Sequence, residues 1–153
     1  MTIDPGVDIG HVHLKVSDLE RAVAFYRDVL GFEVMHRYGD EAAFLAAGGY
    51  HHHIGLNTWE SKGGSPPPPG TTGLFHVAIR YPTRAALAGA VRRVLDADIP
   101  LAGASDHGVS EAIYLRDPDQ NGIELYHDRP REQWPEQMFT APLDLQRLLA
   151  EAA

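Results

Sequence analysis

The sequence predicts an α+β fold in which two βαβββ modules form an eight-stranded, cup-shaped partial barrel around a metal site, followed by a short C-terminal helix. The main observation is an internal repeat with a period of about 65 residues, which aligns residues 9–16 with residues 74–81 and His11 with His76. The second observation is length, since 153 residues, 44% of them hydrophobic, are enough for one core but few for two. We therefore expect residues 1–153 to form a single domain.

The first module is expected to span about residues 9–59. Its opening strand, residues 9–16, places aliphatic side chains on one face and His11 and His13 on the other. An amphipathic helix follows, and Gly31 is well suited to end it. Three short strands are then predicted near residues 32–38, 41–46 and 51–59.

A proline-rich linker, residues 60–73, separates the modules and has a composition that cannot form a strand ladder. The second module, about residues 74–127, repeats the pattern of the first. Its strands are predicted at 74–81, 101–107, 110–117 and 122–127, with a helix over 83–97. The tail, residues 128–153, ends in a short leucine-rich helix that could pack on its own chain or on a second subunit.

Composition narrows the range of partners. The 21 acidic and 13 basic residues give a formal charge of −8, and no lysine or arginine cluster lies on a predicted element, so we expect no nucleic acid partner. An apolar run near 18 residues and a secretory signal pattern are both missing, so we expect a cytoplasmic protein without a membrane partner. Because the chain has no cysteine, any metal must be held by histidine, carboxylate or water.

The clearest chemical signal is the hairpin predicted between residues 105 and 124. Tyr114 and Glu124 each stand between two aliphatic residues, so both should project from the face opposite the aliphatic one. The intervening Asp-Pro-Asp-Gln-Asn-Gly favours a tight turn. The hairpin therefore predicts one wall of a polar cavity, with a solvated outer face as the alternative.

A metal site is predicted from three residues at corresponding inward positions: His11, His76 and Glu124. Two imidazoles and one carboxylate make a facial triad that holds a divalent metal and leaves coordination positions open. The triad suits Fe(II), and it also suits Mn, Ni or Zn. We expect all three ligands to come from one chain, although the linker is long enough for a homodimer to exchange modules.

These motifs resemble the vicinal oxygen chelate superfamily, and within it the catechol 2,3-dioxygenase (extradiol ring-cleavage) group. The resemblance covers about residues 9–127. It rests on the two strands that carry His11 and His76, on the helix segment from Asp18 to Phe32, and on the segment from His107 to Glu124. This last segment follows the extradiol signature at His107, Ile113, Tyr114, Asp117, Pro118 and Glu124, and departs from it at Ser105 and Gln120.

The resemblance implies a ring-cleaving oxidoreductase whose metal, most often Fe(II), binds a catecholic aromatic substrate and O2. It implies that His107 and Tyr114 bind the substrate or the oxygen. It also implies an acid-base histidine near the end of the first module, where His51, His52 and His53 are the candidates. Strand alternation would turn His51 and His53 inward, and we select His53.

Two other functions are compatible with the same superfamily. A glyoxalase-type lyase or isomerase would carry an acidic ligand on the last strand of the first module, where Gly55 stands instead. A metal-free small-molecule binding or resistance protein would have no reason to carry the matched histidines together with Glu124. Four residues expected to line the cup indicate an aromatic or polar ligand: Asn57, Trp59, Tyr126 and His127.

Overall fold

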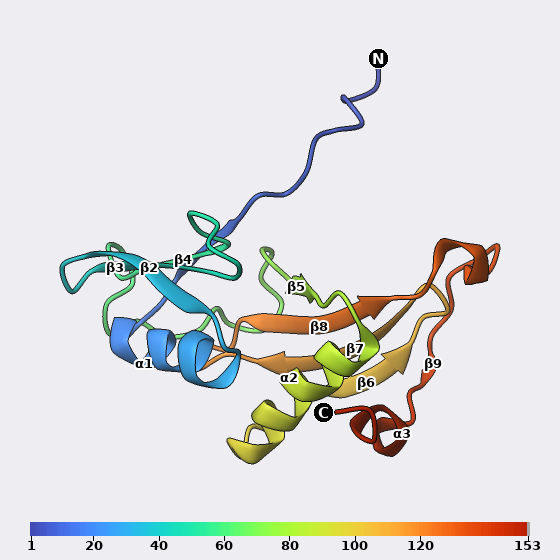
Figure 1. Ribbon diagram of the computed structural model, residues 1–153. Helices are drawn as coiled ribbons and strands as arrows, with labels where there is room; N and C mark the ends of the chain where they lie inside the picture. The colour runs from blue at the N-terminus through green and yellow to red at the C-terminus, as the bar shows by residue number, and fades with distance from the viewer. Residues whose placement is uncertain (153) are drawn as a thin grey trace.

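The computed structural model describes residues 1–152 and contains two open sheets, each covered by a helix (Figure 1). The first sheet consists of β1 (Val12–Lys15), β2 (Glu33–Tyr38), β3 (Ala42–Ala46) and β4 (Ile54–Asn57), in the order β1-β4-β3-β2. The second consists of β5 (Val77–Arg80), β6 (Gly103–Asp106), β7 (Ser110–Arg116), β8 (Gly122–Asp128) and β9 (Ala141–Pro142), in the order β5-β8-β7-β6-β9. These sheets confirm the α+β class and the two βαβββ modules.

The helix of the first module is α1 (Leu19–Ala24), which continues as a π-helical turn over Phe25–Val29. Asp18 caps its start by accepting a hydrogen bond from the Arg21 backbone N–H at 3.0 Å. Gly31, with a φ of +87°, ends the helix as predicted, because glycine adopts this left-handed conformation without strain. The buried face of the helix packs on the first sheet and includes Val23 and Tyr26.

The strands of the first module are shorter than predicted at the positions that matter for function. β1 begins one residue after His11, and β4 begins one residue after His53. Gly48 and Gly49 both have positive φ, and the chain from there to His53 forms an irregular loop rather than a strand. The histidine run therefore lies in a loop at the edge of the first sheet.

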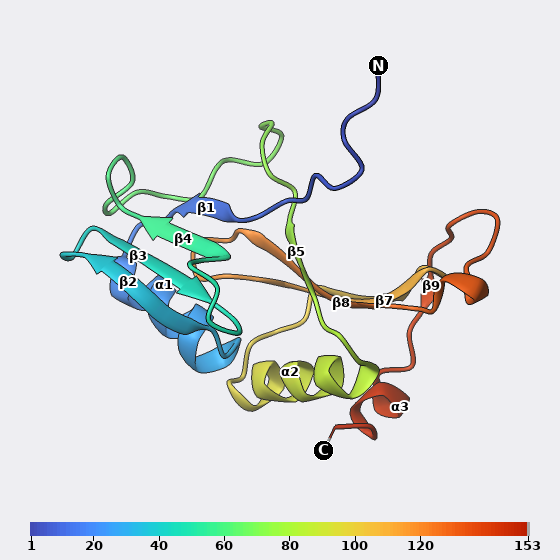
Figure 2. The same cartoon turned by 45° about the horizontal axis from the view of Figure 1, so that its top comes forward.

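The helix of the second module, α2 (Arg84–Asp96), is capped by Thr83, whose hydroxyl accepts from the Ala86 N–H at 3.1 Å. Figures 1 and 2 show α1 and α2 on the same side of the two sheets. The predicted hairpin forms between β7 and β8, and its register sets Tyr114 directly opposite Glu124. Both residues lie on the sheet face away from α2, since Ile113 and Leu125 are buried beneath them.

The C-terminal tail adds structure beyond the two modules. A 3-10 turn at Arg131–Gln133 and the two-residue β9 precede α3 (Leu145–Leu149). Leu148 is fully buried, and Arg92 of α2 donates to the Leu149 carbonyl at 3.0 Å. The tail helix therefore packs on α2 of its own chain, the first of the two arrangements that the sequence left open.

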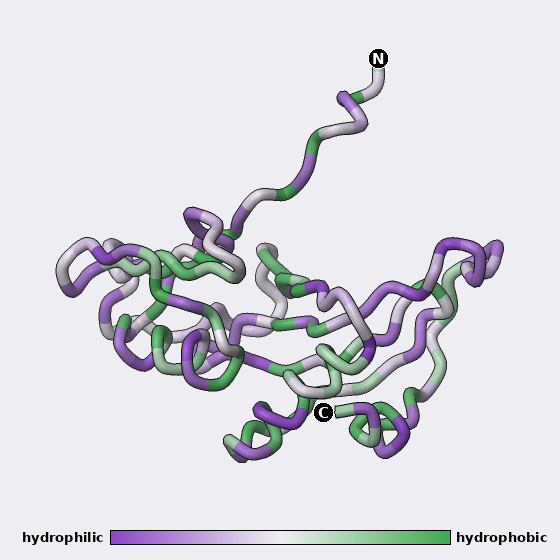
Figure 3. The backbone as a smooth tube through the Cα atoms, in the orientation of Figure 1, coloured by the Kyte–Doolittle hydropathy of each residue, from purple (hydrophilic) through white to green (hydrophobic). Residues whose placement is uncertain are grey.

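The N-terminal segment before β1 extends away from both sheets (Figure 1). Apolar and polar residues alternate along it (Figure 3), and its Ile3, Val7 and Ile9 are exposed. Within residues 1–152, no helix has both the length and the apolar character that a membrane crossing requires.

The modules are joined on their helix side by a buried hydrogen bond. Tyr26 of the first module donates from Oη to Oδ2 of Asp117, in the β7–β8 turn, at 2.8 Å. Burial, reinforced by the negative charge of Asp117, raises the pKa of Tyr26 well above its usual value, so the phenol stays a neutral donor. Nearby, the Ser17 hydroxyl donates to Asp119 at 2.6 Å, and the Arg93 guanidinium donates to the Leu30 carbonyl at 3.1 Å.

Replacing Tyr26 by phenylalanine should lower the free energy of unfolding by ~1–3 kcal/mol, because the buried Asp117 carboxylate loses a donor. Urea denaturation measures the loss. Tyr38→Phe is the matched control, since Tyr38 is 62% exposed and should change stability by less than ~0.5 kcal/mol. Equal stability of the two variants would contradict this role for the Tyr26 hydroxyl.

Candidate functional site

Two of the three predicted metal ligands meet on the second sheet. β5 and β8 are parallel neighbours, and Glu124 of β8 pairs with Ala78, two residues after His76. His76 Nε2 lies 2.8 Å from Glu124 Oε2, and the glutamate side chain is only 13% exposed. A nitrogen and a carboxylate oxygen thus point to the same place at the edge of the sheet.

Gly122 makes this approach possible. A Cβ atom at residue 122 would overlap the Phe75 carbonyl oxygen and lie 3.0 Å from His76 Cβ. Only a residue without a side chain allows the segment before β5 to cross β8 so closely. The glycine of the predicted turn therefore also determines where His76 lies.

Tyr114 and His107 extend the pair into a hydrogen-bonded chain. Tyr114 Oη lies 2.6 Å from His107 Nε2 and 3.4 Å from Glu124 Oε1. His107 Nδ1 lies 3.1 Å from the Phe139 carbonyl oxygen, which can only accept. Nδ1 therefore carries the proton and Nε2 accepts, so the Tyr114 hydroxyl can donate its single proton either to His107 Nε2 or to Glu124 Oε1. Burial, followed by the charge of Glu124, raises the pKa of Tyr114 and keeps it neutral.

His11 lies on the first module, within a layer of aromatic and imidazole rings. Its ring centroid is 4.3 Å from that of His52, and His52 lies 5.1 Å from Phe44. The layer continues from Phe44 to His13 at 5.6 Å and from His13 to Trp59 at 5.5 Å. The first sheet thus presents a ring-lined surface to solvent on the face away from α1.

The ring of His13 occupies the space above Gly55. A Cβ on Gly55 would lie 2.9 Å from His13 Cγ, so a larger residue at 55 would displace that ring. Asn57 was predicted to line the cup. Its side-chain amide nitrogen lies 3.0 Å from His13 Nε2 and donates a hydrogen bond to it. Burial, with a smaller contribution from His11, lowers the pKa of His13. Gly55, which corresponds to Glu124 in the repeat, therefore has the His13 ring above it where the second module has a carboxylate.

The histidine run is arranged differently from the prediction. Strand alternation predicted that His52 faces outward, but the His52 ring contacts His11. The His53 ring packs on Tyr50 with a centroid distance of 4.7 Å, and its Nδ1 accepts a hydrogen bond from the Ala47 N–H at 3.2 Å. The reason is that residues 51–53 precede β4, so the two-residue alternation of a strand does not apply to them. Burial is the main cause that lowers the pKa of His52, and the neighbouring imidazoles add to it.

A single chain assembles the predicted metal site only in part. His76 Nδ1 is buried without a hydrogen-bond partner in residues 1–152. Its Nε2 lies 2.8 Å from Glu124 Oε2, so these two atoms are close enough to bind the same metal ion. His11, however, lies with His52. Across residues 1–152, no three side chains of histidine, aspartate or glutamate are grouped so that they could hold a metal ion together.

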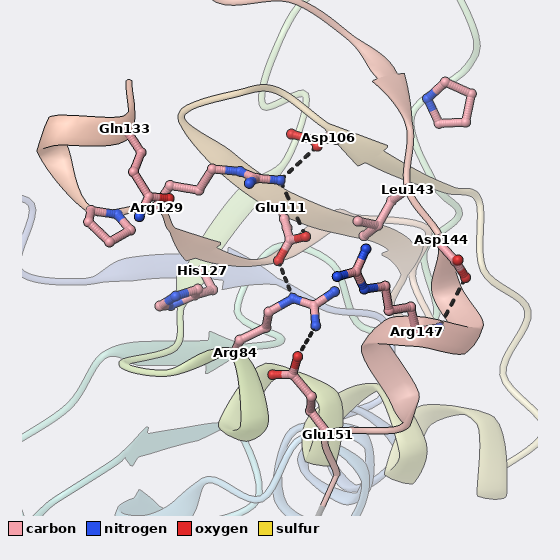
Figure 4. Close-up of a pocket in the computed structure, with 12 residues that line it drawn as sticks. Arg84, Asp106, Glu111, His127, Arg129, Gln133, Leu143, Asp144, Arg147 and Glu151 are labelled. Carbon is pink, nitrogen blue, oxygen red and sulfur yellow. Dashed lines mark hydrogen bonds and ion pairs between the residues drawn. The ribbon is translucent and has the colours of Figure 1, made fainter. Parts of the chain in front are cut away.

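A separate cavity of about 470 Å³ lies between the second sheet, α2 and α3 (Figure 4). Arg84 pairs there with Glu111 at 2.6 Å and also with Glu151, while Arg129 pairs with Asp106 at 2.7 Å. This network ties the tail to the sheet on the helix side, opposite Tyr114. His127 lines this cavity, so the prediction that it lines the cup is wrong: on β8 it alternates with Glu124 and Tyr126 and faces the other side.

One part of the site comes from the tail, for which the sequence carries no signal. Phe139 holds His107 through a backbone carbonyl, and Thr140 Oγ1 lies 3.3 Å from the same Nδ1. The segment also packs over Gly108, where a Cβ would lie 2.6 Å from the Phe139 ring. Any residue type provides a carbonyl, so composition could not reveal this contact.

Comparison with known proteins gives both a family and named relatives. A sequence profile described as the Glyoxalase/Bleomycin resistance protein/Dioxygenase superfamily matches residues 8–125. The chain is 38% identical over 158 residues to a protein named catechol-2,3-dioxygenase from Bacillus subtilis (strain 168), covering 99% of this chain and 54% of that protein. It is 33% identical over 130 residues to biphenyl-2,3-diol 1,2-dioxygenase 3 from Rhodococcus globerulus, covering 84% and 66%. The chain thus spans between half and two thirds of the length of these relatives.

Solved structures agree on the fold. A glyoxalase/dioxygenase from Nostoc punctiforme is 20% identical, with a TM-score of 0.69 over 85% of this chain and 98% of that one. A lactoylglutathione lyase from Agrobacterium tumefaciens is 24% identical, with a TM-score of 0.63 over 81% and 96%. At these identities the likeness is one of fold, and it does not choose between a lyase and a dioxygenase.

Gly122→Ala should destabilise the protein by ~1–3 kcal/mol, because the new methyl group forces the segment of Phe75 and His76 away from β8. Gly89→Ala is the matched control. Gly89 lies in α2 with no atom within 4 Å of an added Cβ, so alanine there should stabilise the helix by ~0.5–1 kcal/mol. Urea denaturation should therefore show changes in the free energy of unfolding of opposite sign for the two variants. An unchanged stability of Gly122→Ala would contradict the close approach of residues 75 and 76 to β8.

Proposed function

We propose that this chain, which belongs to the glyoxalase/bleomycin resistance protein/dioxygenase superfamily, is a metal-dependent dioxygenase that cleaves a catecholic ring with Fe(II) and O2. The observation that carries the proposal is the arrangement of Glu124, Tyr114 and His107 on one hairpin beside His76. The extradiol signature falls on this hairpin, and the two dioxygenase-named relatives support the same reaction class.

The metal would be held by His76 and Glu124, with His11 as the third ligand, although one chain does not bring His11 to the pair. When bound, Fe(II) would supply coordination of both catechol oxygens and electron transfer to O2, which reacts slowly with a catechol directly. A set of two histidines and one carboxylate suits that metal because it leaves coordination positions open. The chain's own contribution is then to bind the substrate and to move its protons.

Tyr114 and His107 are suited to accept a proton from a substrate hydroxyl. The Tyr114 oxygen can accept a hydrogen bond from the substrate while it donates its own proton to His107 Nε2, 2.6 Å away. As the substrate loses its proton, the tyrosine proton can pass to His107. The resulting imidazolium would be stabilised by the Phe139 carbonyl, which already accepts from Nδ1.

The ring layer on the first module supports an aromatic substrate. Phe44, His13 and Trp59 offer ring faces and edges that can pack against a planar ligand. Within this layer we propose His52 as the acid-base group in place of His53, since His52 contacts His11 and His53 points to Tyr50. A metal-free binding protein is the second candidate, because no metal-holding group of three side chains occurs within residues 1–152 of a single chain.

The function is tested by reconstituting the protein with Fe(II) under anaerobic conditions and admitting air in the presence of a panel of catechols. O2 uptake and the visible absorbance of a ring-opened product are expected. Tyr114→Phe should retain metal and lose about 10²- to 10⁴-fold in kcat, while Tyr38→Phe should not. No O2 uptake across the panel, with isomerase activity on a hemithioacetal under Ni or Zn, would select the lyase function instead.

The choice of acid-base histidine is tested by His52→Ala and His53→Ala, each a matched control for the other. His52→Ala should retain bound metal and lose turnover by about 10²-fold or more, because the general acid-base group is gone. His53→Ala should change kcat far less, since its ring packs on Tyr50 outside the ring layer. The reverse order of effects would restore His53 to the role.

A further inference from the structure

We propose that the cavity between the second sheet, α2 and α3, the helix-side cavity, is a binding site for a small carboxylate (Figure 4). The Glu151 carboxylate of the tail binds Arg84 in this cavity, and the ligand takes its place there. The volume of about 470 Å³ falls in the range of roughly 300–1,000 Å³ that is typical of small-molecule sites. The cavity lies on the sheet face opposite Tyr114 and Glu124, so it is separate from the proposed metal site.

A buried carboxylate fixes two arginines in the wall of the helix-side cavity. The Glu111 side chain is only 8% exposed, and its two oxygens accept from Arg84 Nε at 2.6 Å and from Arg129 Nη2 at 3.4 Å. Arg129 Nη2 also donates to Asp106 at 2.7 Å. Because a buried carboxylate is costly to leave unpaired, both guanidinium groups are held in place. Guanidinium groups that are already fixed lose little freedom when they bind a further anion.

The arginines of the cavity have donors that the surrounding carboxylates do not use. Arg84 donates from Nε to Glu111 and from Nη1 to Glu151, so its Nη2 has no acceptor within residues 1–152. Arg147 reaches into the cavity from α3, and none of the residues drawn in Figure 4 pairs with its guanidinium. Arg129 Nε is buried, and it too lacks an acceptor in the described part of the chain. This surplus favours a ligand that accepts several hydrogen bonds at once, as a carboxylate does.

Glu151 is the acidic group that a ligand can replace. Its side chain is 46% exposed, against 8% for Glu111 and 26% for Asp106, and it follows α3, a helix of only five residues. An exposed ion pair contributes little to stability, so releasing Glu151 costs the fold little. A free carboxylate can bind Arg84 and also Arg147, which Glu151 does not contact through an ion pair. The ligand therefore gains a second cation.

Charge selects a carboxylate over a phosphate. Exchanging Glu151 for another monoanion leaves the charge of the cavity unchanged, whereas a phosphate dianion adds negative charge beside Asp106 and Glu111. That extra charge opposes binding in a cavity where acidic and basic groups are already balanced through ion pairs.

The rest of the lining suits a ligand with an apolar body. Pro130, Pro142 and Leu143 contribute apolar surface to the cavity. His127 Nδ1 lies 3.2 Å from the Tyr81 carbonyl oxygen, which can only accept, so Nδ1 carries the proton and Nε2 is left as an acceptor. Such a lining fits an aromatic or short branched carboxylic acid, and a hydroxyl on that acid could donate to His127.

The test is a titration of the wild-type chain with benzoate, followed through the NMR signals of the arginine side-chain N–H groups. Benzoate should shift the Nε–H signals of Arg84 and Arg147. Benzamide has nearly the same shape without the charge and should shift neither. Equal binding of benzamide would overturn the role of the carboxylate, and equal or tighter binding of inorganic phosphate would overturn the preference for a monoanion.

Two variants should change the affinity for benzoate in opposite directions. Glu151→Gln removes the competing carboxylate and should tighten binding by about three- to fivefold, the factor that one exposed ion pair contributes. Arg147→Gln removes one cation and should weaken binding by a similar factor. Arg80→Gln is the matched control, because Arg80 is an exposed arginine of β5 that does not line the cavity. Equal affinities in the wild type and all three variants would overturn the site.

The position of bound benzoate separates this site from the ring layer of the first sheet. Shifts confined to the ring signals of His13 and Trp59, with Arg84 and Arg147 unchanged, would place the probe on the ring layer and overturn the helix-side site. The titration uses no metal and no assay of turnover. A failure here therefore leaves the dioxygenase proposal standing, and a failure of that proposal leaves this site standing.

Discussion

The Asp117 carboxylate is the group on which the rest of the structure depends. It is 1% exposed and forms no ion pair within residues 1–152, so hydrogen bonds must compensate for its desolvation. Oδ1 accepts from the backbone N–H groups of Asp119 and Asn121, and Oδ2 accepts from the Asn121 side chain and from Tyr26. Three of these four bonds shape the β7–β8 turn, and the fourth reaches the other module.

This one carboxylate links the chemistry of the hairpin to the placement of the modules. The turn that it organises fixes the register between β7 and β8, and that register sets Tyr114 opposite Glu124. The bond to Tyr26 fixes the turn against the helix of the first module. The first and second sheets are therefore held with their helix sides together, and their polar faces are left uncovered. In this arrangement of the modules, His11 does not join His76 and Glu124.

The sequence predicted the interior of each module better than the relation between them. An internal repeat and strand alternation are local properties, so they were enough to find the two sheets, the hairpin and the pairing of His76 with Glu124. The junction has no such signature. In the sequence, Tyr26 cannot be distinguished from the other residues of the apolar helix stripe, and Asp117 cannot be distinguished from other turn residues. Only the folded structure shows that they form a hydrogen bond. Alternation failed at His53 because the strand had not yet begun there.

The difference between Gly55 and Glu124 bears on which reaction the fold can perform. The repeat places these residues at equivalent positions of the two modules, yet only one is a carboxylate, and the His13 ring lies where a side chain on Gly55 would go. A divalent cation held by two neutral imidazoles and one carboxylate keeps a net positive charge. Such a centre attracts an ionised catechol oxygen, whereas a second carboxylate would cancel the charge and weaken that attraction. If the proposed metal binds, a glycine in place of an acidic residue at position 55 would therefore favour an anionic substrate bound directly to it, and this electrostatic preference would distinguish the proposed ring cleavage from the lyase reaction.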